Sequence, residues 1–236
     1  MIFRWNSKVT FNNKTRKVDR IYEVLNSVNK ELIAKANAVD NSLYPIKDRA
    51  PCTAVLLLDN KKYYVKSTFG FEADWFIVDE NQNVVFTLHP SEEKYIRKKR
   101  KLFSKETVEV EDCMYVDELT MNGRDFVLYN VCLGTNKQYI VIHENGNVVS
   151  EIHIDDKVVN YAKCQDLYCI NDKTVIDLTI MYCYLFNVYF NWKHDESIIH
   201  ENGCGTVSFS KDRNEYLLSK FSQEFIDRII AENQME

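Results

Sequence analysis

Glycine and proline are scarce in this sequence, whose 236 residues include 6 glycines and 3 prolines. This scarcity excludes a collagen-like chain and a Gly/Pro-rich linker protein. It also leaves no glycine-rich loop that could cradle a phosphate, and no GxSxG, HExxH or CxxC pattern occurs. Because these motifs are missing, we expect a protein that is not an enzyme and that holds no cofactor.

The sequence also lacks a strong excess of charge and a targeting segment. It has 30 Lys and Arg against 35 Asp and Glu, a net charge of -5, which argues against a general nucleic-acid binder. Its first residues, MIFRWNSKVTFNNK, contain no apolar segment of about 7–15 residues before a small-residue cleavage site, so we expect no signal peptide. The 7 cysteines are odd in number and scattered, which predicts reduced thiols and therefore a cytoplasmic protein. This expectation covers both a protein free in the cytoplasm and one bound peripherally to a membrane.

Signals for β-structure are abundant from Cys52 onward. Short runs such as TAVLLLD, KKYYVKST and RDFVLYNVCL follow one another with turn residues between them. Many short strands without intervening helices predict an antiparallel β-sandwich or β-barrel. Two of the predicted hairpins also resemble each other, FIVDENQNVVFTLH at 76–89 and YIVIHENGNVVSEIH at 139–153, which indicates a duplicated β-unit.

Amphipathic patterns flank this β-rich region on both sides. Residues 19–39 carry apolar side chains at helical spacing, and residues 211–233 do the same. We therefore expect one domain in three parts. These parts are an N-terminal helical extension at 1–51, a β-rich body at 52–192 and a C-terminal helical tail at 193–236.

The segment 174–192, TVIDLTIMYCYLFNVYFNW, is apolar on nearly every face. A transmembrane helix needs about 20 apolar residues, but this segment contains Asp177 and Asn187. A pair of central strands is a second interpretation, although the segment has no internal turn. The third interpretation, a helix buried on all sides, is the one we favour, because a sheet closed around the helix would bury it.

A hairpin of the type YIVIHENGNVVSEIH, then a strand of the type DLYCI, then a wholly hydrophobic helix resembles the tubby C-terminal-like superfamily. That group includes tubby proteins, LURP-one-related proteins and phospholipid scramblases. The resemblance covers residues 52–192 and implies a mainly β (α+β) fold. Its expected form is a closed antiparallel β-barrel of about twelve strands around a central hydrophobic helix, here with added N- and C-terminal helices. The two added helical parts depart from the family pattern.

A dense basic run, KYIRKKRKLFSK, occupies residues 94–105. If it forms a strand, Arg97, Lys99 and Lys101 share one face. Tubby proteins bind phosphoinositide headgroups through basic residues on barrel strands, so the resemblance implies that these three residues form an anionic headgroup site. Acidic residues at 106–112 would dilute the potential of the run. The competing interpretation is therefore a solvated edge strand that lysines protect from pairing.

Two function classes remain open at this point. The first is a non-catalytic tubby-like binding module that recognises an anionic lipid headgroup or a protein partner. The second is a protein-interaction role without lipid binding, such as an adaptor or a toxin-neutralising immunity protein, in which the terminal helices dock the partner. A scramblase-like protein with its helix inserted in a membrane is a third class, which we favour less because we expect no transmembrane segment. We also expect no nucleic-acid partner.

One cluster of metal-ligating residue types follows the apolar segment. His194, His200 and Cys204 lie close together in the sequence. A structural zinc site needs four ligands, and this spacing matches no known zinc pattern. We therefore expect no metal site.

Overall fold

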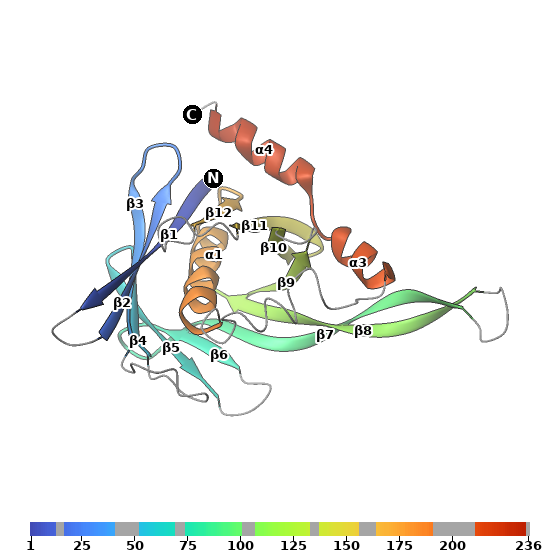
Figure 1. Ribbon diagram of the computed structural model, residues 1–236, viewed down its shortest axis with the longest axis horizontal. Coiled ribbons are helices and arrows are strands. Elements are labelled where there is room, and N and C mark those ends of the chain that lie inside the picture. Colours follow the sequence, from blue (N-terminus) through green and yellow to red (C-terminus); the bar gives the residue numbers. More distant parts are fainter. Residues whose placement is uncertain are drawn as a thin grey trace.

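The computed structural model describes residues 1–12, 17–40, 52–68, 74–100, 107–132, 137–155, 164–190 and 211–234. Twelve strands within these ranges form one closed antiparallel β-barrel (Figure 1). The strands are β1 (Ile2–Asn12), β2 (Lys17–Asn26), β3 (Leu32–Asp40), β4 (Cys52–Leu58), β5 (Lys61–Ser67), β6 (Trp75–Val78), β7 (Val84–Arg100), β8 (Thr107–Met121), β9 (Arg124–Cys132), β10 (Lys137–Glu144), β11 (Asn147–Asp155) and β12 (Cys164–Cys169).

The strands pair in chain order, and the two ends of the sheet meet. β1 pairs with β12 in an antiparallel register that runs from Ile2 opposite Tyr168 to Asn6 opposite Cys164. This pairing closes the barrel and removes the open edges of the sheet. The predicted closed antiparallel barrel of about twelve strands is confirmed.

The expected N-terminal helix is wrong. Residues 19–39 contribute to β2 and β3, so the barrel begins at Ile2 and not at residue 52, and the described part of 1–51 is not a helical extension. The side chain of Asn26 accepts a hydrogen bond from the Val28 amide at 2.8 Å, and Lys30 adopts φ 61°, which together turn the chain between the strands. The apolar spacing fits a helix only if this turn is overlooked. With the turn in place, buried residues alternate along each strand. These residues are Tyr22, Val24, Ala34, Ala36 and Ala38.

The apolar segment forms a helix, α1 (Lys173–Leu185), that continues as a π-helical turn, η1 (Phe186–Phe190). Asp172 caps its N-terminus by accepting the Val175 amide at 3.1 Å. Arg124 holds this cap through a bond to Asp172 at 3.0 Å while it pairs with Glu144 at 2.7 Å. No helix in the described ranges is long and apolar enough to cross a membrane.

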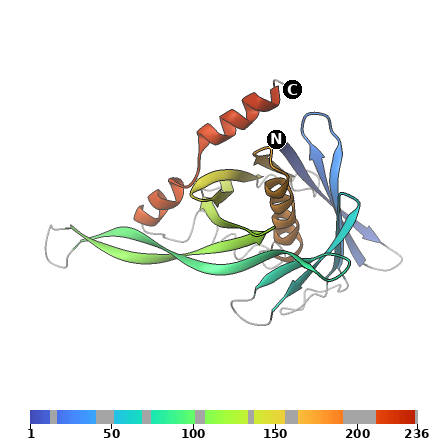
Figure 2. The same cartoon turned by 180° about the vertical axis from the view of Figure 1, so that it is seen from behind.

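The buried side chains of α1 belong to the same hydrophobic cluster as the inward-facing residues of the strands. Figures 1 and 2 both show α1 standing between β1–β5 on one side and β9–β12 on the other. Two polar pairs interrupt this apolar interior. The side-chain amides of Gln165 and Asn187 bond each other at 3.0 and 3.2 Å, and Thr179 Oγ1 lies 2.9 Å from Ser150 Oγ.

The predicted duplication corresponds to two hairpins, β6–β7 and β10–β11. Each hairpin has a shift of register near its turn, between Ile77 and Val78 in the first and between Ile142 and His143 in the second. Positive φ angles occur at Gln82 (68°) in the first turn and at Asn145 (50°) and Gly146 (78°) in the second. The two units therefore share a bulged hairpin shape.

The expected single helix at 211–233 is also corrected. The chain forms two helices, α3 (Lys211–Leu218) and α4 (Gln223–Gln234), which we call together the C-terminal strap (211–234). Ser222 begins the second helix, since its hydroxyl accepts the Phe225 amide at 3.1 Å. The strap lies on the outer wall of the barrel, where Leu217, Phe225 and Ile229 are buried against the sheet (Figure 1).

Strands β7 and β8 are much longer than their neighbours. They pair from Phe86 opposite Met121 to Arg100 opposite Thr107, whereas β6 pairs with β7 only through Leu88 and β9 with β8 only from Asp117. The remaining hairpin projects from the barrel, as Figures 1 and 2 show. We call this projection the β7–β8 arm (89–100 and 107–116).

Candidate functional site

The basic run lies on the β7–β8 arm. Arg97 and Lys99 are two residues apart on β7 and so share one face of the ribbon, as predicted. Lys101 lies outside the described residues. The arm therefore brings together two of the three residues expected to bind a headgroup.

Carboxylates on β8 interleave with these cations. Arg97 Nε lies 3.2 Å from Asp112 Oδ2, and Lys94 Nζ lies 2.7 Å from Glu111 Oε1. Lys98 stands opposite Glu109 in the strand register. Because opposite charges alternate along the ribbon, their potentials largely cancel a short distance away.

The other face of the arm continues the inward-facing row of the barrel into solvent. Along β7 and β8 this row leaves Leu88 and Leu119, both buried, and reaches Ile96 and Tyr115 on the arm. Ile96 is 57% exposed and Tyr115 is 72% exposed. Cys113 is exposed on the same face, opposite Lys94. Two large apolar side chains thus stand among alternating charges.

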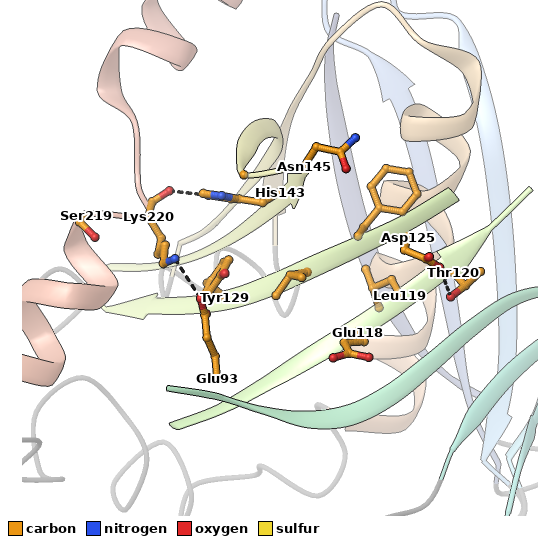
Figure 3. A pocket seen from close by; sticks show the side chains of 13 residues that line it. Glu93, Glu118, Leu119, Thr120, Asp125, Tyr129, His143, Asn145, Ser219 and Lys220 are labelled. Atoms are coloured by element: carbon orange, nitrogen blue, oxygen red, sulfur yellow. Dashed lines mark hydrogen bonds and ion pairs between the residues drawn. The ribbon is translucent and has the colours of Figure 1, made fainter. Parts of the chain in front are cut away.

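A pocket of about 700 Å³ lies on the outer wall, between β8–β10 and the link that joins α3 to α4 (Figure 3). Ionisable and hydroxyl side chains supply much of its lining. They include Glu93, Glu118, Asp125, Tyr129, His143 and Lys220. A volume of this size is typical of small-ligand sites.

Lys220 and Glu93 form the charged centre of this wall. Lys220 Nζ lies 3.3 Å from Glu93 Oε1, and the Tyr216 hydroxyl donates to the same oxygen at 2.7 Å. Burial alone would raise the pKa of Glu93, but hydrogen bonds from Tyr216 and Tyr129 and the charge of Lys220 lower it overall. Burial likewise opposes the charge on Lys220, yet its tyrosine and carboxylate neighbours raise its pKa. The two groups are therefore a stable ion pair at neutral pH.

Aromatic rings surround the same ammonium group. Lys220 Nζ lies 4.6 Å from the ring centroid of Tyr129 and 4.5 Å from that of Tyr216. Both distances are within the range of cation–π attraction. Burial, together with the nearby Glu93 carboxylate, raises the pKa of Tyr129 to about 12, so its hydroxyl stays protonated.

Two further contacts fasten the strap to the wall. His143 Nε2 donates to the Lys220 carbonyl oxygen at 2.9 Å, and burial lowers the pKa of this imidazole, so it is neutral at pH 7. The Ser222 amide donates to Glu151 Oε1 at 3.0 Å. The Glu151 side chain is fully buried, which is unusual for a carboxylate on the outside of a barrel.

Sequence reasoning missed this outer-wall cluster. Glu93, Tyr129, His143 and Lys220 come from four separate elements, and the register of the closed barrel brings them together. No short motif links them. The sequence contains one indirect signal for this cluster, which is a lysine at position 220 between two segments with apolar helix faces.

The histidine and cysteine cluster after α1 lies outside the described residues, at His194, His200 and Cys204. Across the part of the chain that the structure describes, no group of three or more His, Cys, Asp or Glu side chains is arranged to hold a metal ion. The described geometry therefore offers the arm and the outer-wall pocket as the two candidate binding surfaces.

Comparisons of the chain with protein-family models, with curated proteins and with solved structures found no match. The tubby-like resemblance therefore stays a prediction that rests on the order and character of the elements. The barrel, the arm and the pocket are the features from which a function has to be inferred.

Proposed function

We propose that the chain is a non-catalytic binding module, built as a barrel around a central helix like the tubby C-terminal-like superfamily, and that it recognises a protein partner. The packing of α1 supports the architectural part. Val175, Leu178 and Leu185 are fully buried in one cluster with residues of the barrel strands. Such a core makes a rigid scaffold, on which surface features can be presented with little entropic cost on binding.

The exposed apolar side chains on the β7–β8 arm are the observation that indicates a protein as the partner. Tyrosine and large aliphatic side chains that are exposed among charges are typical of binding hot spots with a polar rim. Ile96 and Tyr115 meet this description. The surface that fits them is a protein surface with an apolar hollow, flanked by groups of both signs that complement Lys94 and Glu111.

Recognition of an anionic headgroup is the second candidate, and the basic composition of the arm favours it. A headgroup site needs several cations that converge on one anion without competing partners. On the arm, Arg97 pairs with Asp112 and Lys94 pairs with Glu111. This pairing favours the protein partner.

A photo-crosslinker on Cys113 tests the proposal. This thiol is exposed on the same face as Ile96 and Tyr115, whereas Cys169 and Cys183 are buried. We expect the labelled protein to capture a discrete partner in an extract of its own cells, and the C113S protein treated in the same way to capture none. The captured protein is then purified, and its affinity is measured by calorimetry.

The matched variants decide the outcome. Ile96→Ser with Tyr115→Ser should weaken binding of the purified partner by tenfold or more, about 1.4 kcal/mol or greater. Leu57→Ser, at an exposed apolar position on β4, serves as the control and should bind normally. Equal affinity of the arm variant and the wild type would contradict the proposal.

A further inference from the structure

The surroundings of Lys220 are those of a receptor for an ammonium ion. A carboxylate oxygen lies 3.3 Å from its nitrogen, and two tyrosine rings lie 4.5 and 4.6 Å away. Its side chain is 18% exposed, so most of its hydration has been replaced by these groups. A carboxylate combined with aromatic faces is the usual means by which proteins bind an ammonium group.

The receptor and its occupant come from different parts of the fold. Glu93 on β7 and Tyr129 on β9 belong to the sheet that forms the barrel wall and the base of the arm, whereas Lys220 and Tyr216 belong to the C-terminal strap. Figure 3 shows Glu93 and Tyr129 rising from the strands toward the descending side chain of Lys220. The wall would therefore keep its carboxylate and one aromatic face if the strap moved away.

The receptor also opens into empty space. Glu93, Tyr129 and Lys220 line the pocket of about 700 Å³, together with Glu118 and Asp125 on the far side. With Lys220 removed, all the charged side chains that the structure places around the pocket are carboxylates. The electrostatic character of the pocket then favours a cationic ligand.

The strap is attached in a way that permits exchange. Its link contacts the wall through the polar groups of Glu93, His143 and Glu151, and through the Phe221 ring, whose centroid lies 4.8 Å from that of Tyr139. A fully buried carboxylate, such as that of Glu151 beside the Ser222 amide, is costly to keep out of water. Part of that cost is recovered whenever the strap lifts.

We infer that Glu93 and Tyr129 form an ammonium-binding site on the outer wall of the barrel, which Lys220 occupies in cis and which an external primary ammonium group occupies when the strap lifts. The strap thus acts as an internal competitor for the site. Glu93 lies on the arm, but on the face opposite to Ile96 and Tyr115, so the site stands or falls independently of the protein-binding function proposed above.

Chemical rescue of Lys220→Ala tests the inference. We expect the variant to lose protection from hydrogen exchange by about tenfold or more at strap amides between residues 216 and 229. Propylamine replaces the excised side chain and should restore protection in a saturable manner. In this variant the docked strap no longer competes for the site and adds the Tyr216 ring to it, so the amine binds the docked state more tightly and stabilises it. Propanol and sodium chloride at equal concentrations should not.

The matched control removes the wall carboxylate. Lys220→Ala combined with Glu93→Gln should show no response to propylamine. Ring-proton shifts of Tyr129 in Lys220→Ala provide an independent report of amine binding by NMR. Full strap protection in Lys220→Ala, or rescue by propanol equal to rescue by propylamine, would overturn the inference.

Two probes distinguish the sources of the ammonium group. Nα-acetyl-lysine methylamide represents a lysine side chain of a polypeptide, and putrescine represents a free polyamine. Binding of the first to Lys220→Ala with equal or greater affinity supports a protein-borne lysine. Tighter binding of putrescine supports a free diamine whose second nitrogen reaches Glu118 or Asp125. Binding of neither amine contradicts the inference.

Discussion

The two faces of the barrel wall solve the problem of burial differently. On the inside, α1 meets apolar side chains, and the buried amides of Gln165 and Asn187 satisfy each other. On the outside, the strap covers three titratable groups, Glu93, His143 and Glu151, beside an apolar cluster that includes Val131 and Val141. Apolar burial is insensitive to pH and to small ligands, whereas a contact made through ionisable groups responds to both.

This difference indicates which contacts hold the fold and which can be exchanged. The inner face supplies the stability of the barrel through the buried area of α1 and of the strand residues around it. The outer face attaches a segment through a few polar contacts and a short row of apolar residues, including Leu217 and Ile229. The first should fail only with global unfolding, and the second should open locally.

The largest expected effect is on the inner face. Replacing Ile180 by Lys places a charge at a side chain that is fully buried in α1, and a buried charge without a partner costs several kcal/mol. We expect the Ile180→Lys protein to be unfolded by circular dichroism. Ile180→Val is the matched control and should cost about 1 kcal/mol. A folded Ile180→Lys protein of normal stability would show that α1 is not enclosed.

A second substitution separates polar satisfaction from apolar packing on that face. Gln165→Leu removes the donor to Asn187 Oδ1, whereas Asn187 Nδ2 keeps the Cys183 carbonyl oxygen at 2.8 Å, and an unsatisfied buried acceptor costs about 1–3 kcal/mol. The double variant Gln165→Leu with Asn187→Leu removes both polar groups and should be more stable than Gln165→Leu alone. Urea unfolding measures these differences. Additive losses would mean that the amide pair is not a coupled unit.

The inner face was the part that sequence patterns could predict. The apolar segment around Leu178 predicted α1, and the short β-rich runs predicted the barrel, because burial leaves a periodic trace in the sequence. The N-terminal helix failed for a related reason. Apolar residues between Ile21 and Ile33 fit helical spacing. The turn at residues 27–31 contains no glycine or proline, so no strong turn signal marks it in the sequence.

The outer face could not be predicted in the same way. Glu93 and Lys220 are 127 positions apart, and only the register of a closed barrel brings them together. The apolar pattern also failed to predict the break between α3 and α4 at residues 219–222, since Phe221 and Phe225 continue the helical spacing across it. Long-range polar contacts leave no periodic trace in one sequence.

The next prediction concerns the pH dependence of strap docking. His143 faces Tyr129, Lys220, Glu93 and Glu151, and its pKa in the docked state lies below the ordinary 6.5, chiefly through burial. Stability from the neutral imidazole is therefore present above about pH 6.5 and is lost as the pH falls below it. The pKa of Glu93 is lowered from 4.5, so its contribution is present above that pH and is lost further into acid. Both groups make acid release the strap.

Hydrogen-exchange protection factors at strap amides measure this release. Global melting is unsuitable, because burial raises the pKa of Asp117 to about 6, and a raised carboxyl pKa makes stability fall as the pH rises. We expect strap protection to fall several-fold between pH 7.5 and about pH 5, within the titration range of histidine. His143→Phe should cost about 1 kcal/mol of docking at pH 7.5 and flatten the change. If the pH profile of strap protection in His143→Phe equals that of the wild type, groups other than His143 cause the loss of strap protection in acid.

The smallest expected effect on stability lies on the arm, where the two functional candidates separate. Arg97 is half-exposed and Lys99 is exposed, so replacing Arg97, Lys99 and Lys101 by Ser should change the free energy of unfolding by less than about 1 kcal/mol. The matched control replaces Lys35, Lys62 and Lys66 by Ser, which gives the same change in net charge on other strands.

Sedimentation with anionic vesicles at low ionic strength gives the decisive readout. Because Asp112 and Glu111 neutralise their neighbours on the arm, we expect weak binding by the wild type that both triple variants reduce equally. Binding of that kind depends on net charge and should vanish at physiological salt, where screening acts over about 8 Å. Strong wild-type binding that only the arm variant abolishes would show that the cations converge on a headgroup despite their carboxylate partners. It would make the arm a lipid-binding element and leave the ammonium site of the outer wall untouched.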